Sequence, residues 1–267
     1  MKQRYTQAKA WVLHCGEFLR NAVKEPFAFS EKTSHHDIVT AFDKEVERFF
    51  RDSIGAEFPD DFVVGEEYAS VEKRDPEVTW YIDPIDGTTN FVNMRKNFAI
   101  SLGCYRYDIP QFAFVYDVMA GELYSAFAGE GAYKNEKKLG TEPSATDFRR
   151  MILSVPNVQD AFWRGYPWQD VMLRLADQVR AVRCTGSVAL ELCAVAEGSV
   201  DIFAGMRSAP WDHNGARLIL LESGCKSCAL GREDLPVDRA CSVFACRNET
   251  VFAQLKDVYG FCRETSG

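Results

Sequence analysis

The chain has 267 residues, of which 46% are hydrophobic, and its formal net charge is −8. This size and hydrophobic content are enough for one large domain or two closely packed smaller ones. The acidic balance argues against a nucleic-acid partner, because phosphate contacts need clustered Lys and Arg, and no apolar stretch is long enough to span a membrane.

Two helices are predicted at the start of the chain. Apolar residues recur at helical spacing over residues 6–24. Because this segment reads as an amphipathic helix and not as an apolar run, we expect no signal peptide. A second helix is expected to begin near Thr40, where Thr40 and Asp43 resemble a capping pair, and to include Ile54.

The hydrophobic period then changes to one typical of strands. Segments rich in aromatic and β-branched residues, separated by Gly, Pro or Asp, predict an antiparallel sheet. These segments are residues 61–67, 78–83, 98–106, 111–118 and 122–129. The polar, turn-rich stretch 131–147 places a subdomain boundary near its end.

Strands and helices alternate after this boundary, which is typical of an α/β layer. The expected strands are residues 151–156, 181–184, 199–205 and 241–246, and the expected helices are 168–180, 187–196, 211–222 and 249–259. We therefore predict a layered α/β protein with an N-terminal α+β half, residues 1–147, and a C-terminal α/β half, residues 148–267.

Carboxylates stand at the ends of these predicted elements, where loop residues on a rigid frame often carry chemistry. They are Asp43, Glu66 and Glu67, Asp83 and Asp86, and Asp212. Such a set suits a hard cation such as Mg²⁺. Taken singly, each has a simpler interpretation: a turn residue, a solvated loop or a helix N-cap.

The segment "WYIDPIDGTTN", residues 80–90, holds two of these carboxylates beside a glycine and two threonines. We expect the strand to stop at Asp83, because a Pro and a Gly follow. If a helix opens after Gly87, its free N–H groups form a phosphate cradle. The Thr88 hydroxyl would then orient a water molecule for attack.

These residues carry a family resemblance. The segments "DIVTAFDKEVE", "VVGEE", "WYIDPIDGTTNF" and "PWDHNGARLILLESG" resemble the inositol monophosphatase family of Mg²⁺-dependent, lithium-sensitive phosphatases, in the family's order and over nearly the whole chain. The resemblance implies an α-β-α-β-α sandwich, a homodimer, and metal-assisted attack of water on a phosphomonoester with two or three Mg²⁺ ions.

The resemblance also implies roles for individual residues. The implied metal ligands are Glu66, Asp83, Asp86, Asp212 and the backbone carbonyl of Ile85. The implied catalytic residues are Glu66, Thr88 and Asp43, the last two positioning or activating the water. The implied substrate-binding residues are Asp86, Gly87, Thr88, Gly186, Ser187 and Asp212. Weaker assignments are Lys32, Arg207 and His213.

The sequence departs from the family pattern where substrates are selected. Inositol-selective members carry an acidic residue before the Trp-Asp pair, but Gly205 and Met206 stand in that neighbourhood here. Arg207 is either a contact for a second anionic group or an exposed loop cation. His213 is either a contact for substrate or for a water molecule near the metal, or a partly buried helix residue with a satisfied ring.

The nine cysteines are scattered through apolar stretches, which favours reduced, buried thiols in a cytoplasmic protein. The Cys225-x-x-Cys228 pair lacks a second well-spaced pair, so we do not expect zinc or redox chemistry there. His35 and His36 are interpreted as loop residues.

The sequence thus predicts a phosphoric monoester hydrolase acting on a small soluble phosphate, most simply inositol 1-phosphate. Alternatives within the same fold are fructose 1,6-bisphosphate, NADP or 3′-phosphoadenosine 5′-phosphate, and histidinol phosphate. A catalytically inactive metal-binding module is the alternative of a different class.

Overall fold

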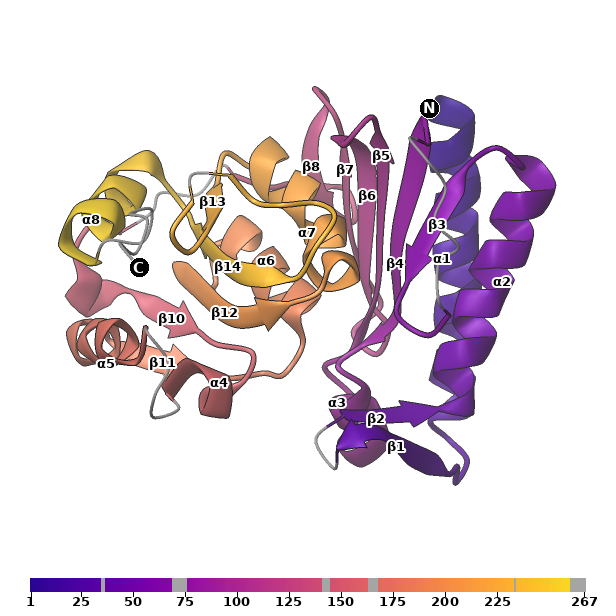
Figure 1. Cartoon of the computed structure of the whole chain (residues 1–267), viewed down its shortest axis with the longest axis horizontal. Helices are drawn as coiled ribbons and strands as arrows, with labels where there is room; N and C mark the ends of the chain where they lie inside the picture. The colour runs from indigo at the N-terminus through magenta and orange to yellow at the C-terminus, as the bar shows by residue number, and fades with distance from the viewer. Residues whose placement is uncertain (35–36, 69–75, 141–144, 163–167, 233, 260–267) are drawn as a thin grey trace.

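The computed structural model describes residues 1–34, 37–68, 76–140, 145–162, 168–232 and 234–259. Within these ranges the elements form five layers in the order helix, sheet, helix, sheet, helix (Figure 1). The predicted sandwich is therefore confirmed. None of the described helices has the length and apolar character needed to cross a membrane.

The first helical layer consists of α1 (Lys2–Ala22) and α2 (Ala41–Glu57), close to the predicted bounds. The capping pair expected at the start of α2 is present: the Thr40 side chain accepts a hydrogen bond from a backbone N–H, and Asp43 accepts one from the Thr40 backbone. Both helices bury apolar residues against the neighbouring sheet, in a core that includes Phe50 and Trp80.

The larger sheet has seven strands in the order β3-β4-β5-β6-β7-β8-β9. Their bounds are β3 (Phe62–Gly65), β4 (Val78–Asp86), β5 (Ala99–Arg106), β6 (Ile109–Asp117), β7 (Glu122–Phe127), β8 (Gly131–Lys134) and β9 (Lys137–Lys138). The antiparallel prediction holds from β4 to β9 and is wrong at the β3 edge, where β3 pairs parallel to β4. The long connection over residues 66–77 allows this parallel pairing, which a tight hairpin would forbid.

Several short strands were not predicted. β8 and β9 extend the sheet within the stretch that reads as turn-rich, and β1 (Phe29–Ser34) pairs with β2 (Asp37–Thr40) in a separate hairpin. These segments are short and polar, so they give no periodic apolar signal.

Strand β4 runs past the point where the sequence predicts its end. It continues through Pro84 to Asp86, with an irregular register against β5 between Asp83 and Asp86. A proline is tolerated at such a bulge because its missing N–H interrupts no regular ladder bond. The bulge places both aspartates in the strand itself.

The central layer consists of α6 (Val188–Glu197) and α7 (Pro210–Glu222), which lie between the two sheets (Figure 1). Helix α7 approaches β5 very closely. A Cβ added at Gly103 would lie 2.7 Å from the carbonyl oxygen of Asn214, and the Tyr105 hydroxyl donates to that oxygen at 3.0 Å. The start of α7 is thereby fixed relative to the larger sheet.

The smaller sheet has the order β11-β10-β12-β14-β13. Its strands are β10 (Ile152–Ser154), β11 (Ala181–Arg183), β12 (Ile202–Ser208), β13 (Lys226–Ala229) and β14 (Cys241–Cys246). The remaining helical elements are α3 (Thr88–Asn93), η1 (Phe148–Arg150), α4 (Val158–Phe162), α5 (Gln169–Gln178) and α8 (Glu249–Tyr259). Strands β10, β11 and β12 are parallel, whereas β13 and β14 pair antiparallel; β13 and α4 were not predicted.

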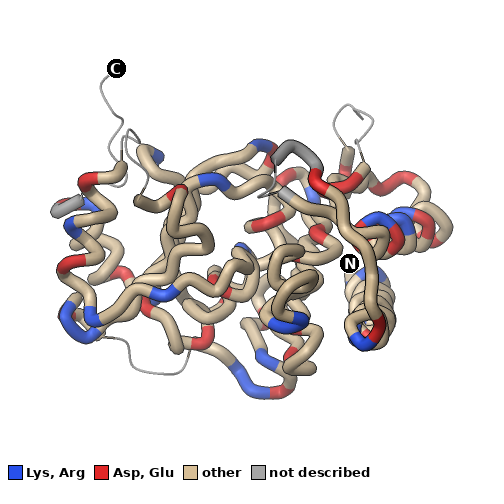
Figure 2. Tube along the Cα trace, turned by 90° about the horizontal axis from the view of Figure 1, so that it is seen from below, with Lys and Arg blue, Asp and Glu red and all other residues tan. Residues whose placement is uncertain are grey.

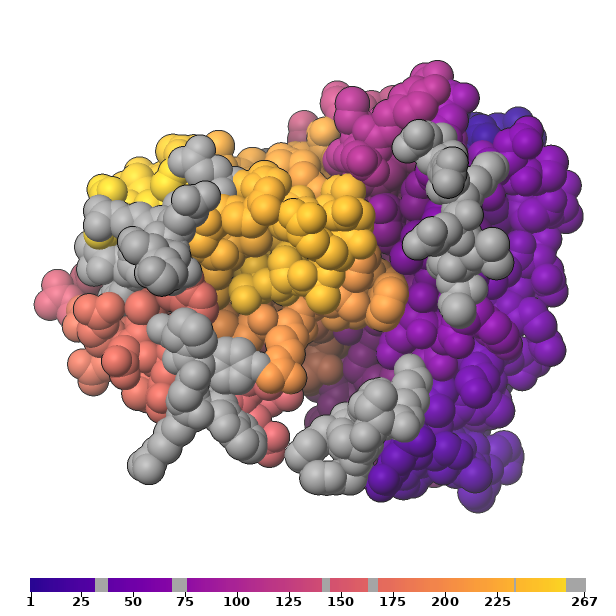
Figure 3. Space-filling model, in the orientation of Figure 1, coloured from indigo at the N-terminus to yellow at the C-terminus, as the bar shows by residue number. Residues whose placement is uncertain are grey.

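The two halves of the chain are in direct contact in the upper part of the view in Figure 3. The larger sheet ends at Lys138 and the smaller sheet begins at Ile152. A division near residue 147 stays a prediction, since α6 and α7 of the C-terminal half share a core with the larger sheet.

We predict that Phe50→Ala lowers the free energy of unfolding by about 3–5 kcal/mol, because it empties a fully buried site between α2 and the sheet. Urea unfolding followed by circular dichroism measures the change. Phe29→Ala is the matched control, because Phe29 is 51% exposed, and it should shift stability by less than about 0.5 kcal/mol. Equal effects of the two variants would contradict the assigned core.

Candidate functional site

The bulge in β4 and the turn that follows it form the centre of the candidate site. Asp83 and Asp86 are 3% and 6% exposed, and the Ile85 N–H donates to Asp83 Oδ1 at 3.0 Å. Gly87 follows with φ +92°, where a Cβ would lie 3.2 Å from the carbonyl oxygen of Gly186. Only glycine combines this left-handed conformation with this close approach. A helix does open next, as expected, because α3 begins at Thr88.

Thr88 and Asp43 lie together, although they are distant in sequence. The Thr88 hydroxyl lies 3.2 Å from Asp43 Oδ1 and 3.1 Å from the carbonyl oxygen of Ile85, so it can donate to either. Asp43 is fully buried, and its Oδ2 accepts from the Thr40 N–H at 2.8 Å and from the Thr40 hydroxyl at 2.6 Å. Asp43 thus holds the hydroxyl of Thr88 in place.

Asp86 reaches across to the C-terminal half, where it meets the start of α6. Its Oδ1 accepts the Val188 N–H at 3.1 Å, and its Oδ2 accepts the Ala189 N–H at 2.8 Å and the Ser187 hydroxyl. These are N–H groups that the helix cannot satisfy internally, and the positive end of the helix dipole favours a carboxylate there. The Gly186–Ser187 turn predicted to bind substrate is therefore adjacent to Asp86.

Asp212 lies in the first turn of α7, where its Oδ2 accepts the Ala209 N–H at 2.8 Å. The simpler interpretation of Asp212 as the N-cap is wrong, because α7 begins one turn earlier: Ala209 is the N-cap and Asp212 satisfies its free N–H from inside the helix. The structure also brings its charge close to the aspartates of β4, as the electrostatics below show.

Negative charge converges on Asp83. Burial, and then neighbouring carboxylates, raise the pKa of Asp83 well above its ordinary value. The carboxylates that do so, in decreasing order of effect, are Glu66, Asp86, Asp212 and Asp43. Burial also raises the pKa of Asp86 to about 7, although its hydrogen bonds to Ser187, Ala189 and Val188 act in the opposite direction. A divalent cation would offset this repulsion, and an all-oxygen donor set fits Mg²⁺.

The individual ligand set stays a prediction. In the ranges given above, no three or more His, Cys, Asp or Glu side chains are placed to hold a metal ion together. Asp83, Asp86 and Asp212 each accept a backbone N–H, which sets their present orientations.

The weaker assignments fall in different places. Lys32 lies in β1, and its side chain is outside the described part of the structure, as are His35 and His36. Arg207 is exposed on β12. His213 is fully buried and its Nε2 lies 3.0 Å from the Pro236 carbonyl oxygen. This burial favours the interpretation of His213 as a helix residue and argues against a substrate contact.

Gly205, in the neighbourhood where the family resemblance implies an acidic residue, is closely surrounded by side chains of its own strand. A Cβ at this position would lie 2.9 Å from the ring of Phe203 and 3.2 Å from Ser208 Oγ. The neighbourhood of residue 205 is thus filled by the chain itself.

Sequence reasoning missed Glu47, which anchors the loop that carries Glu66. Glu47 is fully buried, and its carboxylate accepts the Glu67 N–H at 2.6 Å and the Tyr68 N–H at 3.3 Å. Arg51 donates to the same carboxylate at 2.7 Å. An available signal was the i, i+4 spacing of Asp43, Glu47 and Arg51 on one helix face.

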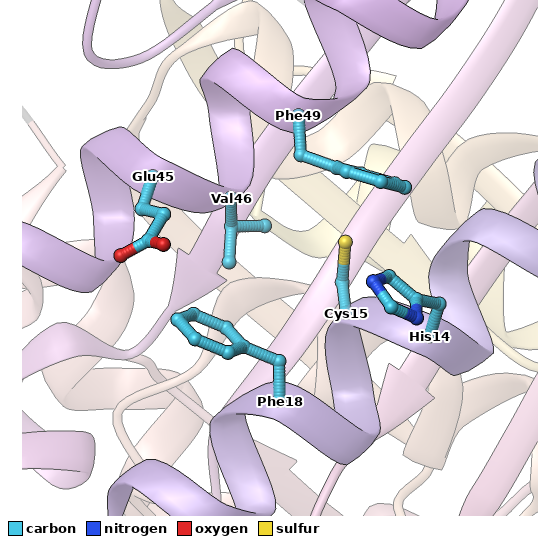
Figure 4. A pocket seen from close by; sticks show the side chains of 6 residues that line it. All are labelled: His14, Cys15, Phe18, Glu45, Val46 and Phe49. Carbon is cyan, nitrogen blue, oxygen red and sulfur yellow. The ribbon is translucent and has the colours of Figure 1, made fainter.

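Cavities are also found outside this carboxylate cluster, among the residues that the structure describes. One, of about 300 Å³, lies between the two halves and is lined in part by Lys134, Thr185 and Glu191. Another, of about 90 Å³, lies between α1 and α2 (Figure 4). Its lining residues are His14, Cys15, Phe18, Glu45, Val46 and Phe49, which include none of the predicted site residues.

Charged and thiol groups elsewhere support no further site. Basic and acidic residues are distributed over both halves of the chain (Figure 2). No two cysteines among the described residues form a disulfide with each other. Cys225 and Cys228 are buried, and burial raises the pKa of the Cys225 thiol, which disfavours the thiolate that metal or redox chemistry needs.

Comparisons with known proteins place this chain among phosphatases. The model of the inositol monophosphatase family matches residues 1–257. The inositol-1-monophosphatase of Bacillus subtilis (strain 168) is 39% identical over 221 residues, which cover 81% of this chain and 82% of that protein. The protein named Nus factor SuhB from Escherichia coli (strain K12) is 35% identical over 195 residues, which cover 73% of this chain and 72% of that protein.

Solved structures agree with this result. SaIMPase-II with inositol monophosphate bound superposes with a TM-score of 0.83 at 30% identity, covering 97% of this chain and 93% of that chain. The same protein with 2′AMP bound gives a TM-score of 0.82 at 29% identity, covering 97% of this chain and 94% of that chain.

The buried ring of His213 generates a pH prediction. Burial lowers the pKa of His213 to about 4, whereas an unfolded chain binds this proton near its ordinary pKa of about 6.5. The contribution to the free energy of unfolding is therefore fully present above about pH 6.5 and is lost as the pH falls towards about 4. The free energy of unfolding, measured with urea at about pH 7 and about pH 5, should differ less between the two pH values for His213→Asn than for the parent chain.

The matched control for this experiment is His14→Asn, because His14 lies exposed on α1. It should leave the difference between the two pH values unchanged. An identical difference in all three proteins would contradict the prediction.

Proposed function

Because the chain belongs to the inositol monophosphatase family, we propose that it is a Mg²⁺-dependent phosphomonoesterase for a small soluble phosphate, with inositol 1-phosphate as the first candidate. The observation that carries this proposal is the convergence of Glu66, Asp86 and two further carboxylates on buried Asp83, beside the Gly87–Thr88 turn. Cations bound there would offset the charge of these carboxylates, which otherwise repel a phosphate.

Carboxylates of both halves of the chain would bind the metal. Glu66, Asp83, Asp86, Asp212 and the carbonyl oxygen of Ile85 would hold the metal. When bound, Mg²⁺ would offset the negative charge of the phosphoryl oxygens and favour the ionisation of water.

The nucleophilic water would be oriented by a pair that the structure brings together. The Thr88 hydroxyl lies within hydrogen-bond distance of Asp43, so that Thr88 can in turn position a water molecule for attack on phosphorus. The N–H groups of Gly87 and Thr88 would hold the phosphoryl oxygens. Glu66, near the same carboxylates, would accept the proton of the water.

The substrate alcohol would lie over the turn at the start of α6. Ser187 and Gly186 are adjacent to Asp86 and Gly87, which fits the predicted set of Asp86, Gly186, Ser187 and Asp212. Hydroxyl groups of a polyol are suitable donors to these carboxylates.

A nucleotide monophosphate is the second candidate substrate. Gly205 and Met206 supply no carboxylate in the neighbourhood where the family resemblance implies one that selects inositol hydroxyls, and SaIMPase-II, 29% identical to this chain, has been solved with 2′AMP bound. Fructose 1,6-bisphosphate and histidinol phosphate have no such support. A homodimer and a cytoplasmic location are further proposals from the family resemblance.

A panel of phosphomonoesters, assayed with Mg²⁺ and with excess chelator, tests the proposed function. We expect phosphate release from inositol 1-phosphate or 2′AMP that vanishes with chelator and falls as lithium is added. Release that persists with chelator would contradict the metal role. Failure on every substrate would favour the inactive binding module.

We predict that Asp86→Asn lowers kcat/KM by about 100-fold or more, because it removes a charge that the metal and substrate would share. Phosphate release under saturating Mg²⁺ measures the loss, and circular dichroism checks the fold. Asp108→Asn is the matched control, since Asp108 is exposed in the turn before β6, and it should retain full activity. Full activity of Asp86→Asn would contradict the proposed site.

A further inference from the structure

The turn between β11 and α6, residues Thr185–Ser187, connects to the candidate site at several points. The Ser187 hydroxyl donates to Asp86, and Asn90 Nδ2 donates to the Thr185 carbonyl oxygen at 2.6 Å. The carbonyl oxygen of Gly186 lies so close to Gly87 that a Cβ added at Gly87 would be only 3.2 Å from it. The conformation of this turn therefore sets where Asp86 and Gly87 meet the C-terminal half.

One buried side chain holds the turn. Glu191 lies in the first turn of α6 and is 2% exposed. Its Oε1 accepts the Thr185 N–H at 2.6 Å, the Thr185 hydroxyl at 2.7 Å and the Gly186 N–H at 2.9 Å. Gly186 has φ +83°, and because glycine adopts both signs of φ about equally, these hydrogen bonds select one of several conformations open to the turn.

The cost of burying a carboxylate indicates that the contacts are specific. Glu191 is 2% exposed and lines the cavity between the two halves beside Lys134 and Thr185. Burying a carboxylate is costly unless it is hydrogen-bonded, and the three donors to Oε1 of Glu191 all belong to one turn. An apolar residue would suffice if α6 needed only to be packed.

We propose that Glu191 is a positioning residue for the phosphatase site: it fixes the Thr185–Ser187 turn, and through Ser187 and the start of α6 it fixes the Asp86 carboxylate. This inference rests on the proposed function for its kinetic part. Its mechanical part, the coupling of Glu191 to Asp86, stands on the contacts alone.

The decisive comparison sets Glu191→Ala against Val195→Ala. Val195 is fully buried on the same helix, so its truncation also lowers stability but leaves the turn anchored. We expect Glu191→Ala to lower kcat/KM about 100-fold, the scale of a displacement of about 1 Å in a catalytic group, at temperatures where both variants are folded. Val195→Ala should keep the parent value. Equal activities of the two variants would overturn the inference.

Glu191→Gln provides a second test should the alanine variant fail to fold. The amide oxygen of the glutamine can still accept hydrogen bonds from Thr185 and Gly186. These bonds are weaker than those to a carboxylate, by about a factor of ten in the equilibrium constant. We expect kcat/KM to fall about tenfold. A loss as large as that of Asp86→Asn would overturn a purely positioning role, because it would require Glu191 to act in the chemistry itself.

Amide hydrogen exchange separates this inference from the proposed function. In metal-free protein, Glu191→Ala should speed exchange over residues 184–190 and also over residues 84–90, whereas Val195→Ala should not. Unchanged exchange over residues 84–90 would overturn the inference even if the enzyme is active. If the parent chain hydrolyses none of the phosphates but the exchange pattern appears, the proposed function fails and the coupling stands.

Discussion

Mutual repulsion of buried carboxylates is the constraint on which the rest of this structure depends. Each carboxylate near Asp83 raises the free energy of ionising the others. The fold offsets part of this with hydrogen bonds: Asp43 accepts from Thr40, Asp86 from the start of α6, and Asp212 from Ala209. What remains uncompensated favours a bound cation. An acidic chain can in this way become a receptor for an anionic substrate.

The two halves of the chain are each incomplete without the other. The larger sheet carries Asp83 and Asp86, but the N–H groups that satisfy Asp86 belong to α6. Helix α7 brings Asp212 and is placed by its close packing on β5. The layered architecture therefore serves the site directly, because a helical layer shared by two sheets lets residues distant in sequence meet at one point.

Much of this arrangement was predictable from local pattern. Apolar periodicity indicated α1, α2, the strands β4–β7 and the alternation after residue 150, and the motif around Asp83 indicated the family. The prediction that the strand stops at Asp83 was wrong, because a bulge accommodates Pro84 inside β4. Glu47 and Glu191 escaped notice since each lies within a helix and owes its role to contacts with residues elsewhere in the chain. Contacts between residues distant in sequence do not change the spacing of apolar residues along the chain, so this pattern cannot predict them.

Helix α2 presents Asp43 and Glu47 one turn apart on the same face, the first bound to Thr88 and the second to the loop of Glu66. Since a helical turn rises about 5.4 Å, α2 sets the spacing between these two contacts along its axis. The backbone geometry of a single helix thereby determines how far apart the Thr88 hydroxyl and the loop of Glu66 lie.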